Sequence, residues 1–221
     1  MQQVDVIAID GPVASGKGSV SARVAKILGF NVLDSGSLYR LTAYASLKKG
    51  ADLDNESEIA VIAASLKPVF SDGKIFLEDE DVTDAIRHED IGLAASRIAI
   101  HPVVRKELFD LQRAFAEAPG LVADGRDMGS VVFPEAVLKV FLTASAEARA
   151  QRRFNQLRDK GISSNIDSLV QDLKDRDERD MKRSTAPLVP AEGAKILDSS
   201  DLTLDETVNQ VLEWYREIRQ H

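Results

Sequence analysis

A glycine-rich turn between an apolar segment and an amphipathic segment constrains the fold of this chain more than any other feature. Residues 4–10, "VDVIAID", are apolar and β-branched, which is typical of a buried strand. In residues 19–29, "SVSARVAKILG", apolar side chains recur every three or four positions up to Gly29, which indicates an amphipathic helix. The stretch therefore predicts a strand, a tight glycine-rich loop and a helix in direct succession.

The loop itself has the spacing of a phosphate-binding loop. Gly11, Gly16 and Lys17 satisfy G-x-x-x-x-G-K, in which backbone N–H groups surround a β-phosphate and the lysine reaches the β- and γ-oxygens. The alternative is a surface turn that matches by chance, which the flanking strand and helix disfavour. Gly18 follows the lysine where Ser or Thr usually binds Mg²⁺, and Ser19 comes next. The sequence contains no N-K-x-D motif, which disfavours a switch GTPase.

Length and composition indicate one globular domain. A chain of 221 residues can bury one α/β core with insertions. With 29% charged and 44% apolar residues, and no apolar run near the roughly 18 residues of a membrane span, neither disorder nor a membrane helix is predicted. The N-terminus lacks the pattern of a secretion signal and the chain has no cysteine, so we expect a cytoplasmic protein.

Charge is distributed unevenly along the chain. The net charge of −8 argues against a nucleic-acid-binding surface, and we expect no such partner. Residues 147–183 nevertheless contain ten Lys or Arg against eight Asp or Glu. A basic segment in an acidic protein favours a small anionic ligand, and a solvated charged helix is the alternative.

Short apolar segments alternate with longer helix-like segments. The further strand candidates are "FNVLDSG", "GLVADG", "LKVFLTAS" and "AKILDSS", and helices are expected at 37–49, 102–117, 145–160, 166–182 and 205–219. This alternation predicts a parallel sheet with both faces covered, whose ligands bind beyond the C-terminal ends of the strands. Three of these strands end in Asp10, Asp34 and Asp124, so we expect carboxylates along that edge.

One segment interrupts this alternation. Two short apolar runs flank Asp72 and Gly73, a strong signal for a β-hairpin. With its flanking helices it predicts a small β insertion.

The segment "DSGSLYR" follows the second strand. Ser35 and Arg40 are expected near the same sheet edge, where the guanidinium fork of Arg40 suits a phosphate. The alternative is a helix N-cap at Ser35 or Ser37 with Arg40 on the surface.

The segment "ADGRDMGSVVFP" follows the third strand. Asp124 occupies a position from which a carboxylate can hold Mg²⁺, directly or through water. Arg126 can bind a phosphate, and Asp127 can accept a hydrogen bond from an amino group, the group that distinguishes cytosine from uracil. The alternative is an ordinary Asp-Gly turn with an exposed ion pair.

Two arginine clusters follow. Arg149, Arg152 and Arg153 lie in one expected helix, and Arg176, Arg179 and Arg183 lie along the next, with Asp180 four residues after Arg176. Such rows usually form solvated salt bridges, but in a phosphate-binding protein they can neutralise the charge of a transferring phosphoryl group.

Together these stretches resemble the bacterial cytidylate (CMP/dCMP) kinases, a family of nucleoside monophosphate kinases. The resemblance rests on "IDGPVASGKGS", "VLDSGSLYR", "DVTDAIR", "AASRIA", "QRAF", "ADGRDMGSVVFP", "DRDERD" and "APLVP", and therefore runs through nearly the whole chain. Ala148 and the pair Met181-Lys182 are small departures from the family pattern.

The resemblance implies a single P-loop NTPase domain over residues 1–221. Its fold is a five-stranded parallel sheet flanked by helices, with an enlarged monophosphate-binding insertion containing a small β-hairpin, and with a short lid. The implied core comprises 1–36, 106–148 and 184–221, the insertion about 37–105 and the lid about 149–165, with the helix 166–183 contributing to the site.

The resemblance also implies the activity, which is transfer of a phosphoryl group from ATP to CMP or dCMP with Mg²⁺. Because no heptad pattern in the sequence requires an oligomer, we expect a monomer. The implied ATP-binding residues are Gly11, Pro12, Val13, Ala14, Ser15, Gly16, Lys17, Gly18 and Ser19. The implied substrate-binding residues are Ser35, Arg40, Ser96, Arg105, Arg126, Asp127, Arg176, Asp180 and Arg183. The implied catalytic residues are Lys17, Arg126, Arg149, Arg153 and Arg183, and the metal ligands Ser19 and Asp124.

Two other functions stay open from the residues. A P-loop kinase could act on a different small acceptor, and screening of acceptors would distinguish it. A nucleotide-binding switch would bind ATP without phosphoryl transfer.

Overall fold

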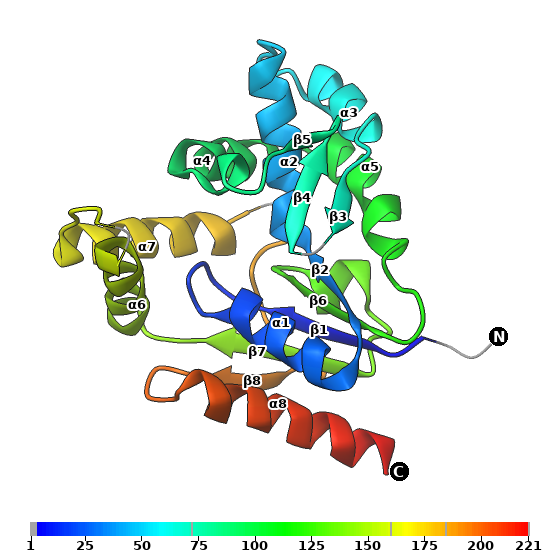
Figure 1. Cartoon of the computed structure of the whole chain (residues 1–221), viewed down its shortest axis with the longest axis vertical. Coiled ribbons are helices and arrows are strands. Elements are labelled where there is room, and N and C mark those ends of the chain that lie inside the picture. Colours follow the sequence, from blue (N-terminus) through cyan, green and yellow to red (C-terminus); the bar gives the residue numbers. More distant parts are fainter. Residues whose placement is uncertain (1–3, 72, 160, 184, 221) are drawn as a thin grey trace. The chain divides into compact units, whose positions relative to one another are not determined.

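The computed structural model describes residues 4–71, 73–159, 161–183 and 185–220 (Figure 1). The chain forms two compact units, Met1–Leu33 with Phe115–His221 and Asp34–Ala114. The core, insertion and lid boundaries stay predictions.

The first unit is built on a parallel sheet. Among the described residues this sheet has five strands in the order β2-β6-β1-β7-β8. The strands are β2 (Asn31–Asp34), β6 (Leu121–Gly125), β1 (Val6–Asp10), β7 (Leu138–Thr143) and β8 (Lys195–Asp198). Every residue of β1 and of β6 is buried, because these central strands are covered on both faces. The predicted fold class is confirmed.

Helices of the first unit follow the predicted segments closely. They are α1 (Lys17–Leu28), α6 (Ala146–Asp159), α7 (Ile166–Met181) and α8 (Leu204–Arg219), and a π-helical turn spans Met128–Val132. Apolar faces of α1 and α8 pack on the sheet, where Val20 and Val24 meet Ile7 and Val211 in one buried cluster. Figure 1 shows α1 and α8 beside β1, β7 and β8, and α6 beside α7.

In the described part of the second unit, four helices and a 3₁₀ turn combine with a small antiparallel sheet. The elements are α2 (Ser35–Lys48), α3 (Glu56–Ala64), β3 (Val69–Ser71), β4 (Lys74–Leu77), β5 (Glu80–Asp81), the turn Ala85–Arg87, α4 (Glu89–Ile98) and α5 (Pro102–Arg113). β3 pairs with β4, and Ser71 lies opposite Lys74, which confirms the predicted hairpin. Asp72 itself lies outside the described residues.

The alternative N-cap for α2 and the expected end of α5 are both wrong. Asp34, not Ser35 or Ser37, caps α2, since its carboxylate accepts a hydrogen bond of 3.1 Å from the Ser37 N–H. Helix α5 ends at Arg113, four residues before the expected end, and the Ala-Pro-Gly run at 118–120 leads directly into β6.

No helix within the described ranges is both long and apolar enough to cross a bilayer.

Candidate functional site

The predicted phosphate-binding loop joins β1 to α1 and is closely packed. A Cβ atom on Gly11 would lie 2.0 Å from the carbonyl oxygen of Leu142 on β7, so only glycine lets the loop approach that strand. Gly16 has φ 91° immediately before α1 begins, a conformation that also favours glycine. The loop therefore lies where the residues before α1 can direct N–H groups towards an anion.

Lys17 is held across this loop. Its ammonium group donates a hydrogen bond of 3.1 Å to the carbonyl oxygen of Pro12, and only 9% of the residue is exposed. A buried ammonium group needs such acceptors, and a phosphate offers stronger ones. This arrangement keeps the positive charge at the loop.

Asp10 ends β1 and is also buried. Its two carboxylate oxygens accept hydrogen bonds of 2.8 Å from the N–H groups of Met128 and Gly129 in the π-helical turn. Burial raises the pKa of Asp10 to about 6, even though these two N–H groups and Lys17 lower it. Asp10 fixes the backbone directly after Asp127.

Asp124, at the end of β6, faces the start of α1. A Cβ atom on Gly18 would lie 3.6 Å from Oδ2 of Asp124, and the exposed Ser19 follows Gly18. Mg²⁺ in kinases is commonly bound by one or two oxygen side chains together with phosphates and water. The Asp124 carboxylate and the Ser19 hydroxyl are oxygen donors of this kind, so they fit a Mg²⁺ ion shared with a nucleotide.

Arg126 and Arg183 both contact Asp180. The Nε atom of Arg126 and Nη2 of Arg183 each lie 2.5 Å from a carboxylate oxygen of Asp180, which is 1% exposed. Burial alone raises the pKa of Asp180, but the guanidinium groups of Arg126, Arg183 and Arg176 more than offset it, so the pKa lies below its ordinary value. The structure thus brings together three of the predicted phosphate and sugar contacts.

The other predicted residues of the first unit follow β6 or lie on α6 and α7. Asp127 is buried, and its carbonyl oxygen accepts hydrogen bonds from the N–H groups of Val131 and Val132. On α6, Arg153 is half-buried and Arg149 is buried and paired with Asp177 of α7. Arg179, in contrast, is exposed and bonds to a carbonyl within its own helix.

In the second unit, Ser35 and Arg40 lie on α2. The Ser35 hydroxyl donates a hydrogen bond of 2.7 Å to Gln112 of α5. Arg40 donates to the carbonyl oxygen of Ile86 at 2.7 Å, and a Cβ atom on Gly92 would lie 2.7 Å from its Nη2. Gly92 of α4 therefore leaves the space that the half-buried guanidinium occupies.

Arg105 and Ser96 lie on α5 and α4 of the same unit. The Arg105 guanidinium lies over the ring of Tyr39, 5.8 Å from its centroid, and donates to the carbonyl oxygen of Ala99. The Ser96 hydroxyl donates to the carbonyl oxygen of Gly92 at 3.0 Å. The sequence reasoning missed Tyr39 and Gln112, whose positions among helical residues carry no distinguishing pattern.

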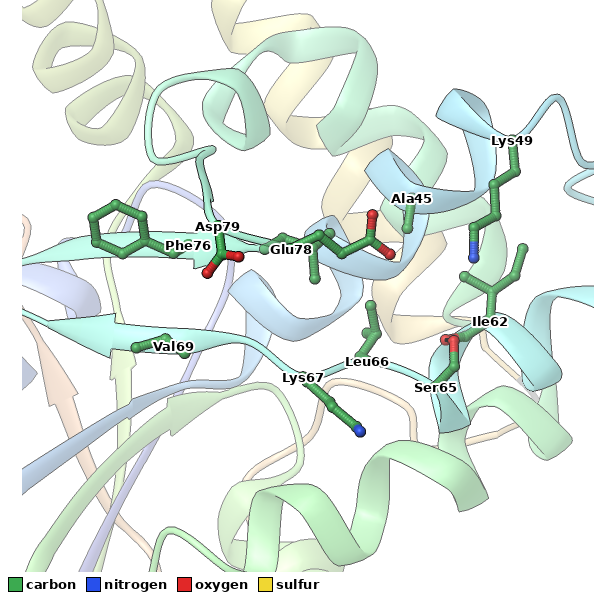
Figure 2. Close-up of a pocket in the computed structure, with 11 residues that line it drawn as sticks. Ala45, Lys49, Ile62, Ser65, Leu66, Lys67, Val69, Phe76, Glu78 and Asp79 are labelled. Carbon is green, nitrogen blue, oxygen red and sulfur yellow. Dashed lines mark hydrogen bonds between the residues drawn. The ribbon is translucent and has the colours of Figure 1, made fainter.

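A pocket of about 640 Å³ also lies in the second unit (Figure 2). Apolar side chains such as Leu66 and Phe76 line it together with Lys49, Lys67 and Glu78. None of the predicted site residues belongs to its lining. The predicted site therefore does not depend on this pocket.

Comparisons with known proteins agree with the resemblance. The family model described as cytidylate kinase matches residues 7–217. A cytidylate kinase of Polynucleobacter asymbioticus is 58% identical over 216 residues, which cover 98% of each chain. A cytidylate kinase of Cupriavidus necator is 58% identical over 219 residues, which cover 99% of each chain.

Among solved structures, a gluconokinase from Sinorhizobium meliloti is similar in fold. The match has a TM-score of 0.50 at 16% identity and covers 100% of this chain and 97% of the gluconokinase. At this identity the likeness concerns the fold alone.

Proposed function

The chain belongs to the cytidylate kinase family, so it is an enzyme that transfers a phosphoryl group from ATP to CMP or dCMP, and we propose how its residues share this reaction. The observation that carries the function is the family match over nearly the whole chain. The enzyme uses ATP and Mg²⁺. We place it in the cytoplasm, as a monomer with neither nucleic acid nor membrane as a partner.

The phosphate-binding loop from Gly11 to Ser19 would bind the phosphates of ATP. Lys17 supports this role, because its ammonium group already lies against the loop and can exchange the Pro12 carbonyl for phosphate oxygens. Ser19 and Asp124 would hold the Mg²⁺ ion, which neutralises phosphate charge when bound. Gly18 lies beside the Asp124 carboxylate, since a Cβ atom on Gly18 would be 3.6 Å from its Oδ2.

We assign each group of the nucleoside monophosphate to its own set of residues. We assign its phosphate to Arg40, Arg126 and Arg183. The sugar is assigned to Arg176 and Asp180, and the base to Ser35, Ser96, Arg105 and Asp127. Asp127 is assigned to the base because a carboxylate can accept a hydrogen bond from the amino group that distinguishes cytosine from uracil.

No general base is needed for this reaction. The attacking group is a phosphate oxygen that is largely ionised at neutral pH, unlike a hydroxyl group that must lose a proton. Catalysis then consists of positioning two anionic nucleotides and neutralising the charge between them. Arg153, on α6, is assigned to the transferring phosphoryl group together with Lys17, Arg126 and Arg183.

A coupled assay of ADP release tests the function, with Mg-ATP and with CMP, dCMP, UMP, AMP, GMP or no acceptor. We expect turnover mainly with CMP and dCMP. Equal rates of ADP release with all five acceptors contradict the function and favour the alternative, a P-loop kinase that acts on a different acceptor. Binding of ATP without transfer to any acceptor would indicate a nucleotide-binding switch.

Two variants test the reading of the base. Asp127→Ala and Arg105→Ala each remove a charged hydrogen-bonding group, so we expect kcat/KM for CMP to fall about 10- to 100-fold relative to UMP. The KM for ATP should change little. Arg97→Ala is the matched control, because Arg97 is an exposed arginine of α4 paired with Asp54. An unchanged CMP preference in both test variants contradicts the assignment.

A further inference from the structure

Two arginines of α6 contact the phosphate-binding loop through its carbonyl oxygens. Nη1 of Arg149 donates a hydrogen bond of 3.1 Å to the carbonyl oxygen of Val13. Nη1 of Arg152 donates one of 3.3 Å to the carbonyl oxygen of Ser15. Residues more than a hundred positions apart in the sequence are thereby joined.

Arg149 also donates hydrogen bonds outside the loop. Its Nε donates to the carbonyl oxygen of Ala144 at 2.9 Å, and both Nη atoms donate to the carboxylate of Asp177 on α7, one of them at 3.0 Å. Four of the five guanidinium N–H groups thus have protein acceptors, and the residue is 3% exposed. A charge buried to this extent requires a paired counter-charge, which Asp177 provides.

Holding a carbonyl group also orients the next N–H group. In a planar trans peptide the C=O and the following N–H point in opposite directions. An arginine that binds the Val13 carbonyl therefore turns the Ala14 N–H away from α6, and Arg152 does the same for the Gly16 N–H through Ser15. These N–H groups belong to the loop that surrounds phosphates.

We propose that Asp177 and Arg149 are positioning residues, in which Asp177 fixes Arg149 and Arg149 fixes the N–H groups of the phosphate-binding loop. The inference rests on the proposed function, because it takes the loop as the ATP site. It gives Arg149 a different role from the predicted direct contact with the transferring phosphoryl group. Asp177, which the sequence reasoning did not single out, becomes part of the ATP-binding apparatus.

The Asp177→Asn variant distinguishes the two roles of Arg149 by the sign of its effect. If Asp177 holds a positioning arginine, its neutralisation loosens the loop, and we expect Kd for Mg-ATP and for Mg-ADP to rise about tenfold each. The KM for CMP at saturating ATP should stay within about twofold. If Arg149 instead awaits a phosphate, removing its competing carboxylate tightens ATP binding. Tighter or unchanged binding by calorimetry overturns the proposal.

A second variant separates this coupling from a loss of folding. Arg149→Lys keeps the charge but lacks the planar fork that contacts Val13 and Asp177 together, so we expect a similar rise in both Kd values. The double variant with Asp177→Asn and Arg149→Lys should have a Kd for Mg-ATP no higher than that of the single variant that binds more weakly, since both substitutions break the same ion pair. Additive losses contradict the proposal. Urea unfolding midpoints of all variants check that the chain folds.

Glu147→Gln is the matched control. Glu147 of α6 forms an exposed ion pair with Lys174 of α7 at 2.9 Å, so it joins the same two helices without contacting the loop. We expect its ATP affinity to equal that of the wild type. The proposed function and this inference can fail independently. If the wild type binds ATP but does not phosphorylate CMP, and Asp177→Asn binds ATP more weakly, the proposed function fails while this inference holds.

Discussion

Among single residues, Asp10 links the stability of the protein to pH. The pKa of Asp10 is raised from 3.8 to about 6 by burial, so the folded state binds a proton more tightly than the unfolded state. As pH rises through this window, the unfolded state loses its proton first and the free energy of unfolding decreases. Above about pH 6, the raised pKa of Asp10 has lowered the free energy of unfolding by about 3 kcal/mol.

Asp10→Asn removes this titration. We expect the free energy of unfolding of the variant, relative to wild type, to increase by about 2–3 kcal/mol between pH 4 and pH 7. Urea unfolding of both proteins across this range measures the difference. Asp205→Asn, at an exposed carboxylate paired with Arg23, serves as the control. Parallel pH curves for wild type and Asp10→Asn would contradict the expectation.

The position of Asp10 at the sheet edge follows from its sequence, but its partners do not. An acid at the end of a buried apolar run is predicted to lie at the C-terminal edge of a parallel sheet, and the same holds for Asp124. The N–H groups of Met128 and Gly129 reach Asp10 only because residues 128–132 form a π-helical turn. No periodicity in "MGSVV" indicates that turn.

At the scale of elements, local sequence signals account for most helices. The end of α1 at Gly29 has the left-handed conformation that glycine adopts readily. Helix α8 begins with a capping box, in which the Thr203 hydroxyl accepts from the Glu206 N–H and the Glu206 carboxylate accepts from the Thr203 N–H. Such signals explain why the bounds of α8 differ from prediction by a single residue.

Thr203→Ala removes the first of these two hydrogen bonds. We expect the free energy of unfolding to fall by about 1 kcal/mol, which urea unfolding can measure. Thr203→Ser keeps the hydroxyl and should retain most of the stability. Equal losses in both variants would mean that the methyl group, rather than the cap, stabilises α8.

Contacts between elements were less predictable than the elements themselves. Arg149 and Asp177 are separated by 28 positions, and their pairing depends on how α6 and α7 pack. The sequence indicates two charged helices, in which each arginine of a cluster is an equal candidate for a phosphate. The structure distinguishes the buried Arg149 from the exposed Arg179.

At the scale of the whole molecule, folding and nucleotide binding are linked. A ligand that binds only the folded chain stabilises it by about 2.7 kcal/mol at a concentration of 100 Kd. We expect Mg-ATP without acceptor to raise the unfolding temperature of the wild type accordingly. In Lys17→Ala the same ATP concentration should give a much smaller shift, because the charge at the loop is lost. Lys26→Ala, at an exposed position of α1, should respond like wild type.

The fold of the whole chain was therefore predicted from local patterns and family resemblance, and the pairing of charges within it was not. The family resemblance implied a five-stranded parallel sheet, whereas the ion pairs of Asp180 depend on where α7 ends. Arg183 was expected to continue a helical row, but α7 ends at Met181. Arg183 then reaches Asp180 from outside the helix.

The two ion pairs of Asp180 also determine when side-chain entropy is lost. Each long arginine side chain gives up as much as about 2 kcal/mol of rotamer freedom when it becomes fixed. Arg126 and Arg183 are already fixed against a carboxylate, so this entropy is lost during folding. An anion that binds to them exchanges one set of oxygen partners for another, and its affinity is not reduced by the ordering of two flexible side chains.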